Sequence, residues 1–245
     1  MYPQVPDDDQ FEGLPQDDSA YLEDVEREMP RAPVSYRGSS SDPTFGYLIA
    51  LALAVGLTPV LPANGDMRYT LVWAVMAGFA VLGWLFGTMQ RIEQELPENL
   101  AWGVIFGIIV GAPLLLVGGS ALSTTVERLF SIETDGSLHA LSAGVVLAYL
   151  VFVMPLAETL FFRGLMQERR AFWLIGTLST IWSLVLFAPM LDLLNFPGVA
   201  VLIGIALFLM NMIYSYVRER NGLAAAWLCQ ITVNIIVLFV PFISR

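Results

Sequence analysis

A carboxylate and a guanidinium lie five residues apart in a segment that is otherwise mostly apolar. They are Glu158 and Arg163, in the run PLAETLFFRGLMQERR at residues 155–170. Ionisable groups next to membrane spans are costly, so such a pair indicates a function. A carboxylate can act as a general base on water. Further along, Gln230 and Asn234 have the i,i+4 spacing that places both on one face of a helix.

General base chemistry near neutral pH also needs partners that titrate or bind metal. The single histidine, His139, lies nineteen residues before Glu158. We expect both on one helix, which separates them by ~28 Å. The single cysteine, Cys229, lies in an apolar run and is expected to pack as a small hydrophobic residue. The spans contain no His, Cys and carboxylate cluster suited to zinc. The sequence therefore predicts no metal and no cofactor.

The composition is that of an integral membrane protein. Of 245 residues, 56% are hydrophobic and 14% charged, and the mean hydropathy is +0.67. Most of the net charge of −10 belongs to residues 1–44, which carry eleven acidic residues and three arginines. We expect this segment to be an acidic disordered tail. The lack of a basic patch argues against nucleic acid as a partner.

Residues 45–245 are predicted to form one transmembrane domain, an all-α polytopic bundle of about seven helices. The apolar stretches approach the ~20 residues that cross the hydrocarbon and lie near 45–61, 69–89, 100–122, 141–157, 172–190, 198–217 and 223–243. The first is short, and whether it spans is left open. Residues 123–140 are expected to be a loop with an interfacial helical turn. With the N-terminus inside, eight arginines lie on the cytoplasmic side and three opposite, which favours a cytoplasmic N-terminus in a bacterial inner or plasma membrane.

The run AETLFFRG resembles the first motif, E-E-x-x-x-R, of the CAAX-protease and bacteriocin-processing (CPBP) family of intramembrane glutamate-dependent proteases. The resemblance covers roughly residues 141–238. Thr159 stands in place of the second Glu, Leu191 in place of the His of F-x-x-x-H, and Gln230 in place of the His of H-x-x-x-N, which retains Asn234. The resemblance implies that Glu158, Leu191 and Gln230 surround one intramembrane cavity. Equal residue counts from a turn near 171–175 place Leu191 level with Glu158.

The resemblance implies the chemistry of this family, which is peptide hydrolysis. In it, a Glu activates water, and His residues orient the water or bind metal. Leu191 has no polar atom, and the Gln230 amide cannot titrate. Glu158, Arg163 and Asn234 are then motif remnants, with Glu158 either protonated or paired with Arg163 or another helix. We therefore predict an inactive binding, adaptor or membrane-complex subunit. Two alternatives remain: an endopeptidase that uses Glu158 on prenylated or membrane peptides, and a small-molecule transporter, which is disfavoured because no paired broken helices are visible.

The predicted partners are the lipid bilayer, other membrane protein subunits, and a lipid or prenyl chain in the pocket. A ridge of small residues, Gly103, Gly107 and Gly111, permits close helix contact either within the chain or with a partner. Asn211 is expected to make an interhelical hydrogen bond. Four tryptophans near span ends are expected to be interfacial anchors: Trp73, Trp84, Trp102 and Trp173.

Overall fold

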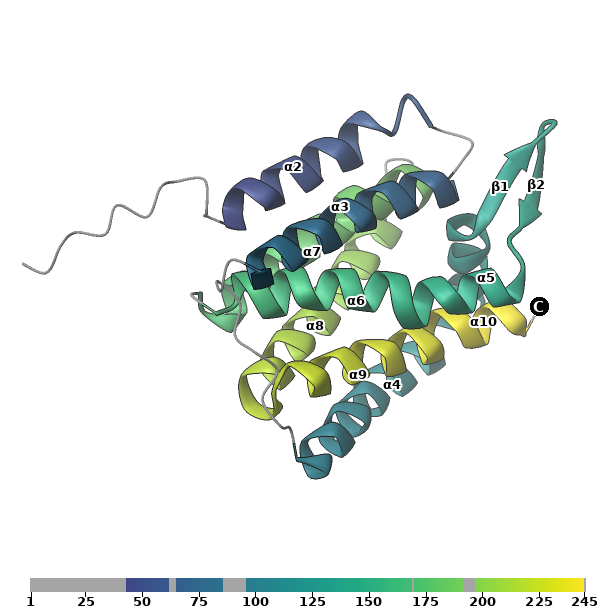
Figure 1. Ribbon diagram of the computed structural model, residues 1–245. Helices are drawn as coiled ribbons and strands as arrows, with labels where there is room; N and C mark the ends of the chain where they lie inside the picture. Colours follow the sequence, from purple (N-terminus) through teal and green to yellow (C-terminus); the bar gives the residue numbers. More distant parts are fainter. Residues whose placement is uncertain (1–42, 62–64, 86–95, 169, 192–196, 245) are drawn as a thin grey trace, which may run out of the picture. The chain divides into compact units, whose positions relative to one another are not determined.

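The computed structural model describes residues 43–61, 65–85, 96–168, 170–191 and 197–244. Most of the predicted acidic tail, up to residue 42, lies outside these ranges. The described part is a bundle of helices with one small β-hairpin (Figure 1). The predicted fold class, a polytopic helical membrane bundle, is confirmed.

Five elements of the described chain are α-helical throughout or nearly so: α2 (Pro43–Gly56), α3 (Gly65–Leu85), α4 (Pro97–Leu129), α7 (Phe172–Leu191) and α8 (Pro197–Asn221). Of these, α4 is kinked at Gly119, where φ is 41° and ψ is −124°. Two further rods alternate between α and π geometry. The first comprises α5 (Ala143–Ala148), η2 (Tyr149–Val153), α6 (Met154–Glu158) and η3 (Thr159–Met166). The second comprises α9 (Leu223–Asn234), η4 (Ile235–Phe239) and α10 (Val240–Ile243). We call them the Glu158 rod and the C-terminal rod.

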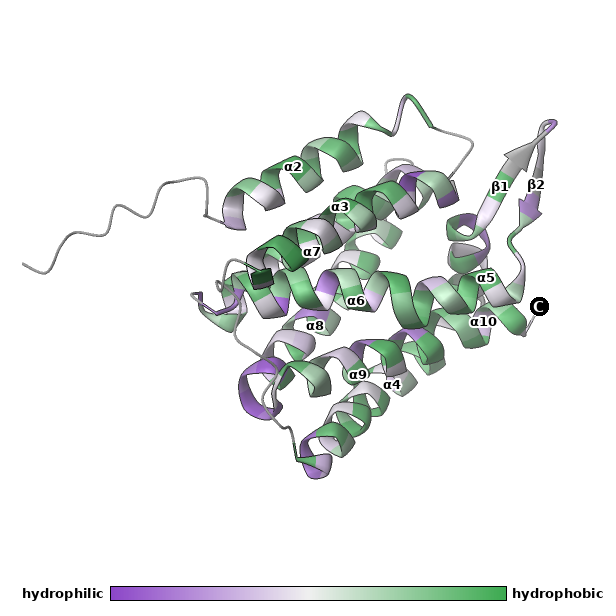
Figure 2. Cartoon of the chain, viewed as in Figure 1, coloured by the Kyte–Doolittle hydropathy of each residue, from purple (hydrophilic) through white to green (hydrophobic). Residues whose placement is uncertain are grey.

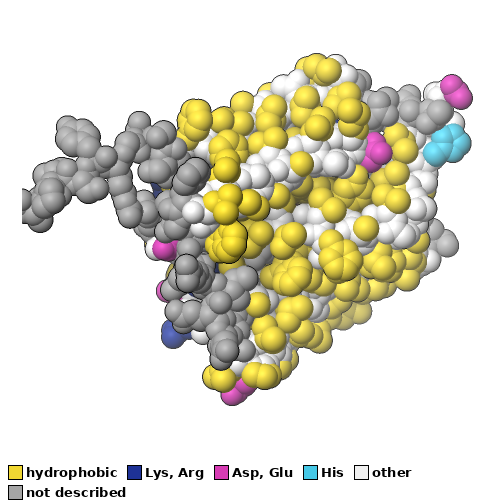
Figure 3. All heavy atoms as spheres, viewed as in Figure 1, with side chains coloured by type: hydrophobic (Ala, Val, Ile, Leu, Met, Phe, Trp, Pro, Cys, Tyr) yellow, Lys and Arg dark blue, Asp and Glu magenta, His cyan; other side chains and the backbone are white. Residues whose placement is uncertain are grey.

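Six of these elements are long and apolar enough to cross a membrane. Apolar residues dominate along them, and hydrophobic side chains cover the middle of the visible face (Figures 2 and 3). The first predicted span is the exception, because α2 has only 14 residues. At 1.5 Å per residue it reaches ~21 Å, short of ~30 Å of hydrocarbon. The count of about seven therefore becomes six spans and one shorter apolar helix.

Residues 123–140 differ from the predicted loop. The helix α4 continues to Leu129, and the hairpin of β1 (Ser131–Thr134) and β2 (Ser137–Ala140) follows. The strands are antiparallel, with Ser131 opposite Ala140. Asp135 and Gly136 turn the chain with φ of 53° and 74°, which is the Asp-Gly signal typical of a two-residue hairpin. His139 thus lies on a strand, and the prediction that it shares a helix with Glu158 is wrong.

The glycine ridge faces the C-terminal rod, not a partner. A Cβ on Gly103 would lie 2.3 Å from the carbonyl oxygen of Ala225, and one on Gly107 would lie 2.6 Å from the Cβ of Thr232. Only glycine allows α4 and α9 to approach this closely. Of the two alternatives left open by the sequence, the structure therefore selects contact within the chain.

Candidate functional site

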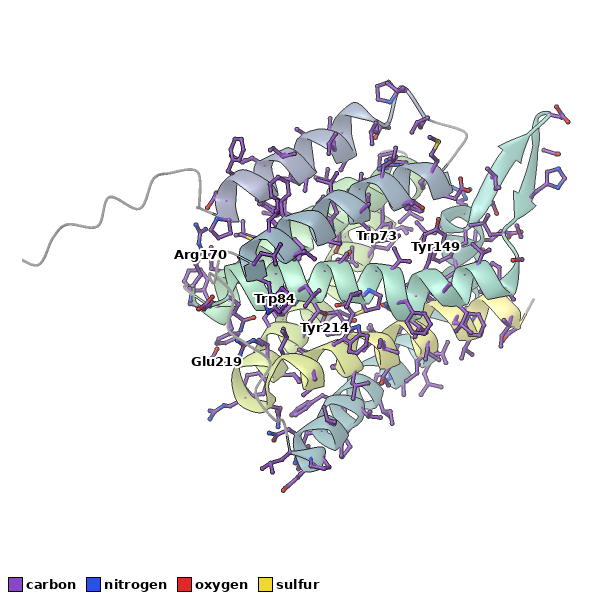
Figure 4. All side chains as sticks on the ribbon, in the orientation of Figure 1. Trp73, Trp84, Tyr149, Arg170, Tyr214 and Glu219 are labelled. Carbon is purple, nitrogen blue, oxygen red and sulfur yellow. The ribbon has the colours of Figure 1, made fainter. Side chains whose placement is uncertain are left out.

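Glu158 lies at the centre of a buried polar cluster between the helices. Its side chain is 3% exposed. One carboxylate oxygen, Oε1, accepts hydrogen bonds from the indole N–H groups of Trp73 on α3, at 3.1 Å, and Trp182 on α7, at 3.2 Å. The other, Oε2, accepts from the amide Nε2 of Gln230 on α9, at 2.7 Å. Three helices thus donate to a carboxylate on a fourth segment (Figure 4 labels Trp73).

The amide of Gln230 is fixed from both ends. Its Nε2 donates to Glu158, while its Oε1 accepts from the hydroxyl of Thr159 at 2.8 Å. Thr159 and Gln230 occupy positions where the resemblance places Glu and His, and here they bond to each other. One turn further along α9, the amide of Asn234 donates to the carbonyl of Leu150 at 3.0 Å. The structure joins Glu158, Gln230 and Thr159 by hydrogen bonds, and Asn234 bonds to the Glu158 rod one turn away. Of the residues predicted to surround one cavity, Glu158 and Gln230 are in direct contact, and the cavity itself stays a prediction.

Arg163 forms a second polar cluster in the direction of the rod's C-terminal end. The rod changes to π geometry at Thr159, directly after Glu158. Arg163 is fully buried, and its Nη2 donates to Oδ1 of Asn211 at 2.7 Å and to the hydroxyl of Ser179 at 3.3 Å. Its guanidinium carbon lies 5.4 Å from the ring centroid of Tyr214, within range of a cation–π interaction. The interhelical hydrogen bond predicted for Asn211 is confirmed.

The residue of α7 that bonds to Glu158 is Trp182 and not Leu191. Leu191 comes nine residues later, about 13 Å from Trp182 along the helix axis. A π-helix closes i→i+5 hydrogen bonds and uses more residues per turn, so counting residues at α-helical rise overestimates the length of η3. Leu191 is buried in the same apolar cluster as Trp182. Its assignment to the histidine position stays a prediction.

Two tryptophans of this site were not recognised in the sequence. Trp73 was predicted to be an interfacial anchor, but it is 1% exposed and bonds to Glu158, so that prediction is wrong. Trp182 is also fully buried. A buried indole N–H requires an acceptor, and a lone buried carboxylate requires donors. These two requirements complement each other, and they could have suggested from the sequence that Trp73 and Trp182 donate to Glu158. Trp84, Trp102 and Trp173 are exposed, as anchors should be.

The hydrogen bonds of this cluster hold the Glu158 carboxylate in place, but the cluster offers little acid–base chemistry. Its donors are two indoles and a primary amide, none of which exchanges a proton near neutral pH. Within the described ranges, no group of three or more His, Cys, Asp or Glu residues is arranged to hold a metal ion.

The fold and this cluster define a polytopic integral membrane protein with polar side chains joined between its spans. Residues 140–236 match the model of the family described as type II CAAX prenyl endopeptidase, Rce1-like. The chain is therefore similar to this family across the Glu158 rod, α7, α8 and most of the C-terminal rod, and the resemblance predicted for residues 141–238 is confirmed at the level of the family. No curated protein and no solved structure matched the chain.

Proposed function

We propose that this chain is a catalytically inactive relative of the Rce1-like endopeptidases that works as a binding or adaptor subunit in the membrane. The observation that carries the proposal is the hydrogen bonding of Glu158. A general base must reach the proton of a water molecule at about 2.6–3.2 Å. Here the carboxylate accepts from Trp73, Trp182 and Gln230 and is almost completely buried.

The replaced motif positions support the same proposal. Losing a general acid or base typically lowers the rate by ~10²–10⁴-fold. Thr159 donates to Gln230, and Gln230 donates to Glu158, so these bonds fix the packing of α9 against the Glu158 rod. Leu191 is apolar and buried. A buried polar network that is fully bonded favours one arrangement of helices.

A binding role draws on surfaces outside this cluster. The spans Pro97–Gly119 and Pro197–Asn221 are the least buried of the six, with only 17% of the most apolar part of each buried within the chain. Leu116 and Val117 of α4 are 83% and 88% exposed. These faces suit lipid or the helices of other subunits. The acidic segment at residues 1–44 is expected to favour a basic surface on such a subunit, in a salt-dependent manner.

The experiment is a peptidase assay on the purified full chain with a matched variant. A farnesylated peptide ending in a C-a-a-X sequence and an unprenylated membrane peptide serve as substrates. We expect the wild type and Glu158→Ala to give the same background signal. Cleavage by the wild type that disappears in Glu158→Ala would overturn the proposal and support an endopeptidase that uses Glu158. Glu98→Gln, an exposed change at the start of α4, controls for non-specific loss of protein.

A further inference from the structure

A polar hollow of about 330 Å³ opens at one end of the bundle, apart from the Glu158 cluster. Its lining comes from the end of the Glu158 rod, the residues before α7 and the last turn of α8: Gln167, Glu168, Arg170, Ala171, Arg218 and Glu219. Arg170 and Glu219 lie at the same end of the bundle in Figure 4. Two spans end here and a third begins, at Met166, Asn221 and Phe172. The hollow therefore lies at the level where hydrocarbon gives way to lipid headgroups.

The chain itself positions the two arginines of the hollow. Arg218 donates its Nε to the carbonyl of Arg163 at 3.1 Å, and Arg170 donates to the hydroxyl of Thr44. Both side chains are half-buried. A guanidinium held in this way presents its planar set of N–H donors in a fixed direction, an arrangement that suits the oxygens of a phosphate.

The same hollow also presents acceptors. Glu168 and Glu219 are exposed, and within the described part of the chain neither carboxylate forms an ion pair. Gln167 donates its Nε2 to the carbonyl of Ser215 at 2.7 Å, while its buried Oε1 has no hydrogen-bond partner among the described residues. An unpartnered buried acceptor is costly until a donor reaches it. The lining therefore calls for a ligand that carries a phosphate and also N–H donors.

We propose that this hollow binds the headgroup of a zwitterionic phospholipid with a primary ammonium, namely phosphatidylethanolamine. The phosphate lies between Arg170 and Arg218, and the ammonium donates to the glutamates beside Gln167. A wholly anionic headgroup would meet the carboxylates, and a quaternary ammonium has no N–H to donate. The volume is near the lower end for small-molecule sites. Helix α7 begins directly after Ala171 of the lining, and its residues Trp173 and Ile181 are 58% and 43% exposed, so α7 offers apolar surface to an acyl chain.

The experiment measures lipid binding to the full chain in detergent by native mass spectrometry. The probes are dihexanoyl phosphatidylethanolamine and its phosphatidylcholine and phosphatidylglycerol counterparts. We expect the wild type to prefer the ethanolamine lipid by about tenfold, the factor for one charge-assisted hydrogen bond. Glu219→Gln should remove this preference, because it weakens binding of the ethanolamine lipid and relieves the repulsion of the anionic glycerol lipid. Arg170→Gln should weaken both lipids.

The matched controls are Glu98→Gln and Arg220→Gln, which change exposed charges outside the hollow and should leave all affinities unchanged. Equal affinity of the wild type for the three lipids would overturn the proposal. So would a Glu219→Gln variant that behaves like Glu98→Gln. Free phosphoethanolamine that binds as tightly as the lipid would overturn the assignment to a membrane source. None of these outcomes depends on peptidase activity.

Discussion

Replacing Gly103 by alanine tests the closest helix contact in the bundle. The new Cβ would lie 2.3 Å from the backbone oxygen, 2.9 Å from the carbonyl carbon and 3.0 Å from the Cα of Ala225. Ordinary van der Waals contact begins at 3.4 Å, so α4 and α9 must separate locally by about 1 Å. The obstacle is backbone, which cannot rotate aside as a flexible side chain can.

The magnitude follows from two opposing effects. Overpacking of a well-packed contact typically costs about 1–3 kcal/mol, whereas alanine in place of glycine within a helix contributes about 0.5–1 kcal/mol of stability. Gly204 on α8 is the matched control, because a Cβ there has nothing within 4 Å. Gly204→Ala should therefore stabilise the fold slightly. The two variants should differ by about 1–3 kcal/mol in the free energy of unfolding.

Thermal unfolding in detergent measures this difference, which corresponds to about 2–4 °C for each kcal/mol in a chain of this size. Gly111→Ala should be milder than Gly103→Ala, because its Cβ would meet only the side chain of Ile236 at 3.1 Å. If Gly103→Ala is as stable as Gly204→Ala, the inferred packing of α4 on α9 is wrong. A loss confined to oligomers, with the monomer unchanged, would assign the ridge to a partner instead.

Three further perturbations test the polar clusters and the tail. Trp182→Phe removes one donor to Glu158 and should cost about 1–3 kcal/mol of unfolding free energy, whereas the exposed Trp173→Phe should stay within about 0.5 kcal/mol in the same thermal assay. Asn211→Leu leaves Arg163 without its closest acceptor and should cost about 1.5–3 kcal/mol, the range for a hydrogen bond to a charged group; a loss below about 0.5 kcal/mol would show that the guanidinium finds another partner. Deleting residues 1–40 should keep the bundle folded and weaken co-purification with membrane partners at physiological salt; unchanged recovery would make the tail a simple tether.

The spans could be predicted because hydropathy and length alone determine them. Each of the six spans overlaps a predicted apolar stretch. The hairpin at 131–140 was missed because four-residue strands carry little periodic signal, although Asp135-Gly136 was visible. The spacing of Gly103, Gly107 and Gly111 could not decide whether this ridge contacts another helix of the chain or a partner. Both kinds of helix contact use the same small residues.

The candidate site could be predicted from the sequence only in part. Glu158 and Gln230 could be paired because the resemblance implies that both face one intramembrane cavity. The two tryptophans could not, because nothing in the spacing between Trp73, Trp182 and Glu158 links three separate helices. Asn211 was recognisable as an interhelical partner because a polar residue within a span requires one, but its partner Arg163 follows only from three-dimensional packing.

The surroundings of Glu158 give the proposed inactivity a second physical reason, besides the three replaced residues. Restoring Thr159→Glu, Leu191→His and Gln230→His would return the side chains of the motif. The two indoles would still donate to the carboxylate, and residue 191 would still lie about 13 Å along α7 from Trp182. In the present chain, three donors use three of the about four acceptor sites of the buried carboxylate. We therefore predict that recovery of hydrolysis also needs a smaller residue in place of Trp182, because that change frees an acceptor site on Oε1 and opens space beside it.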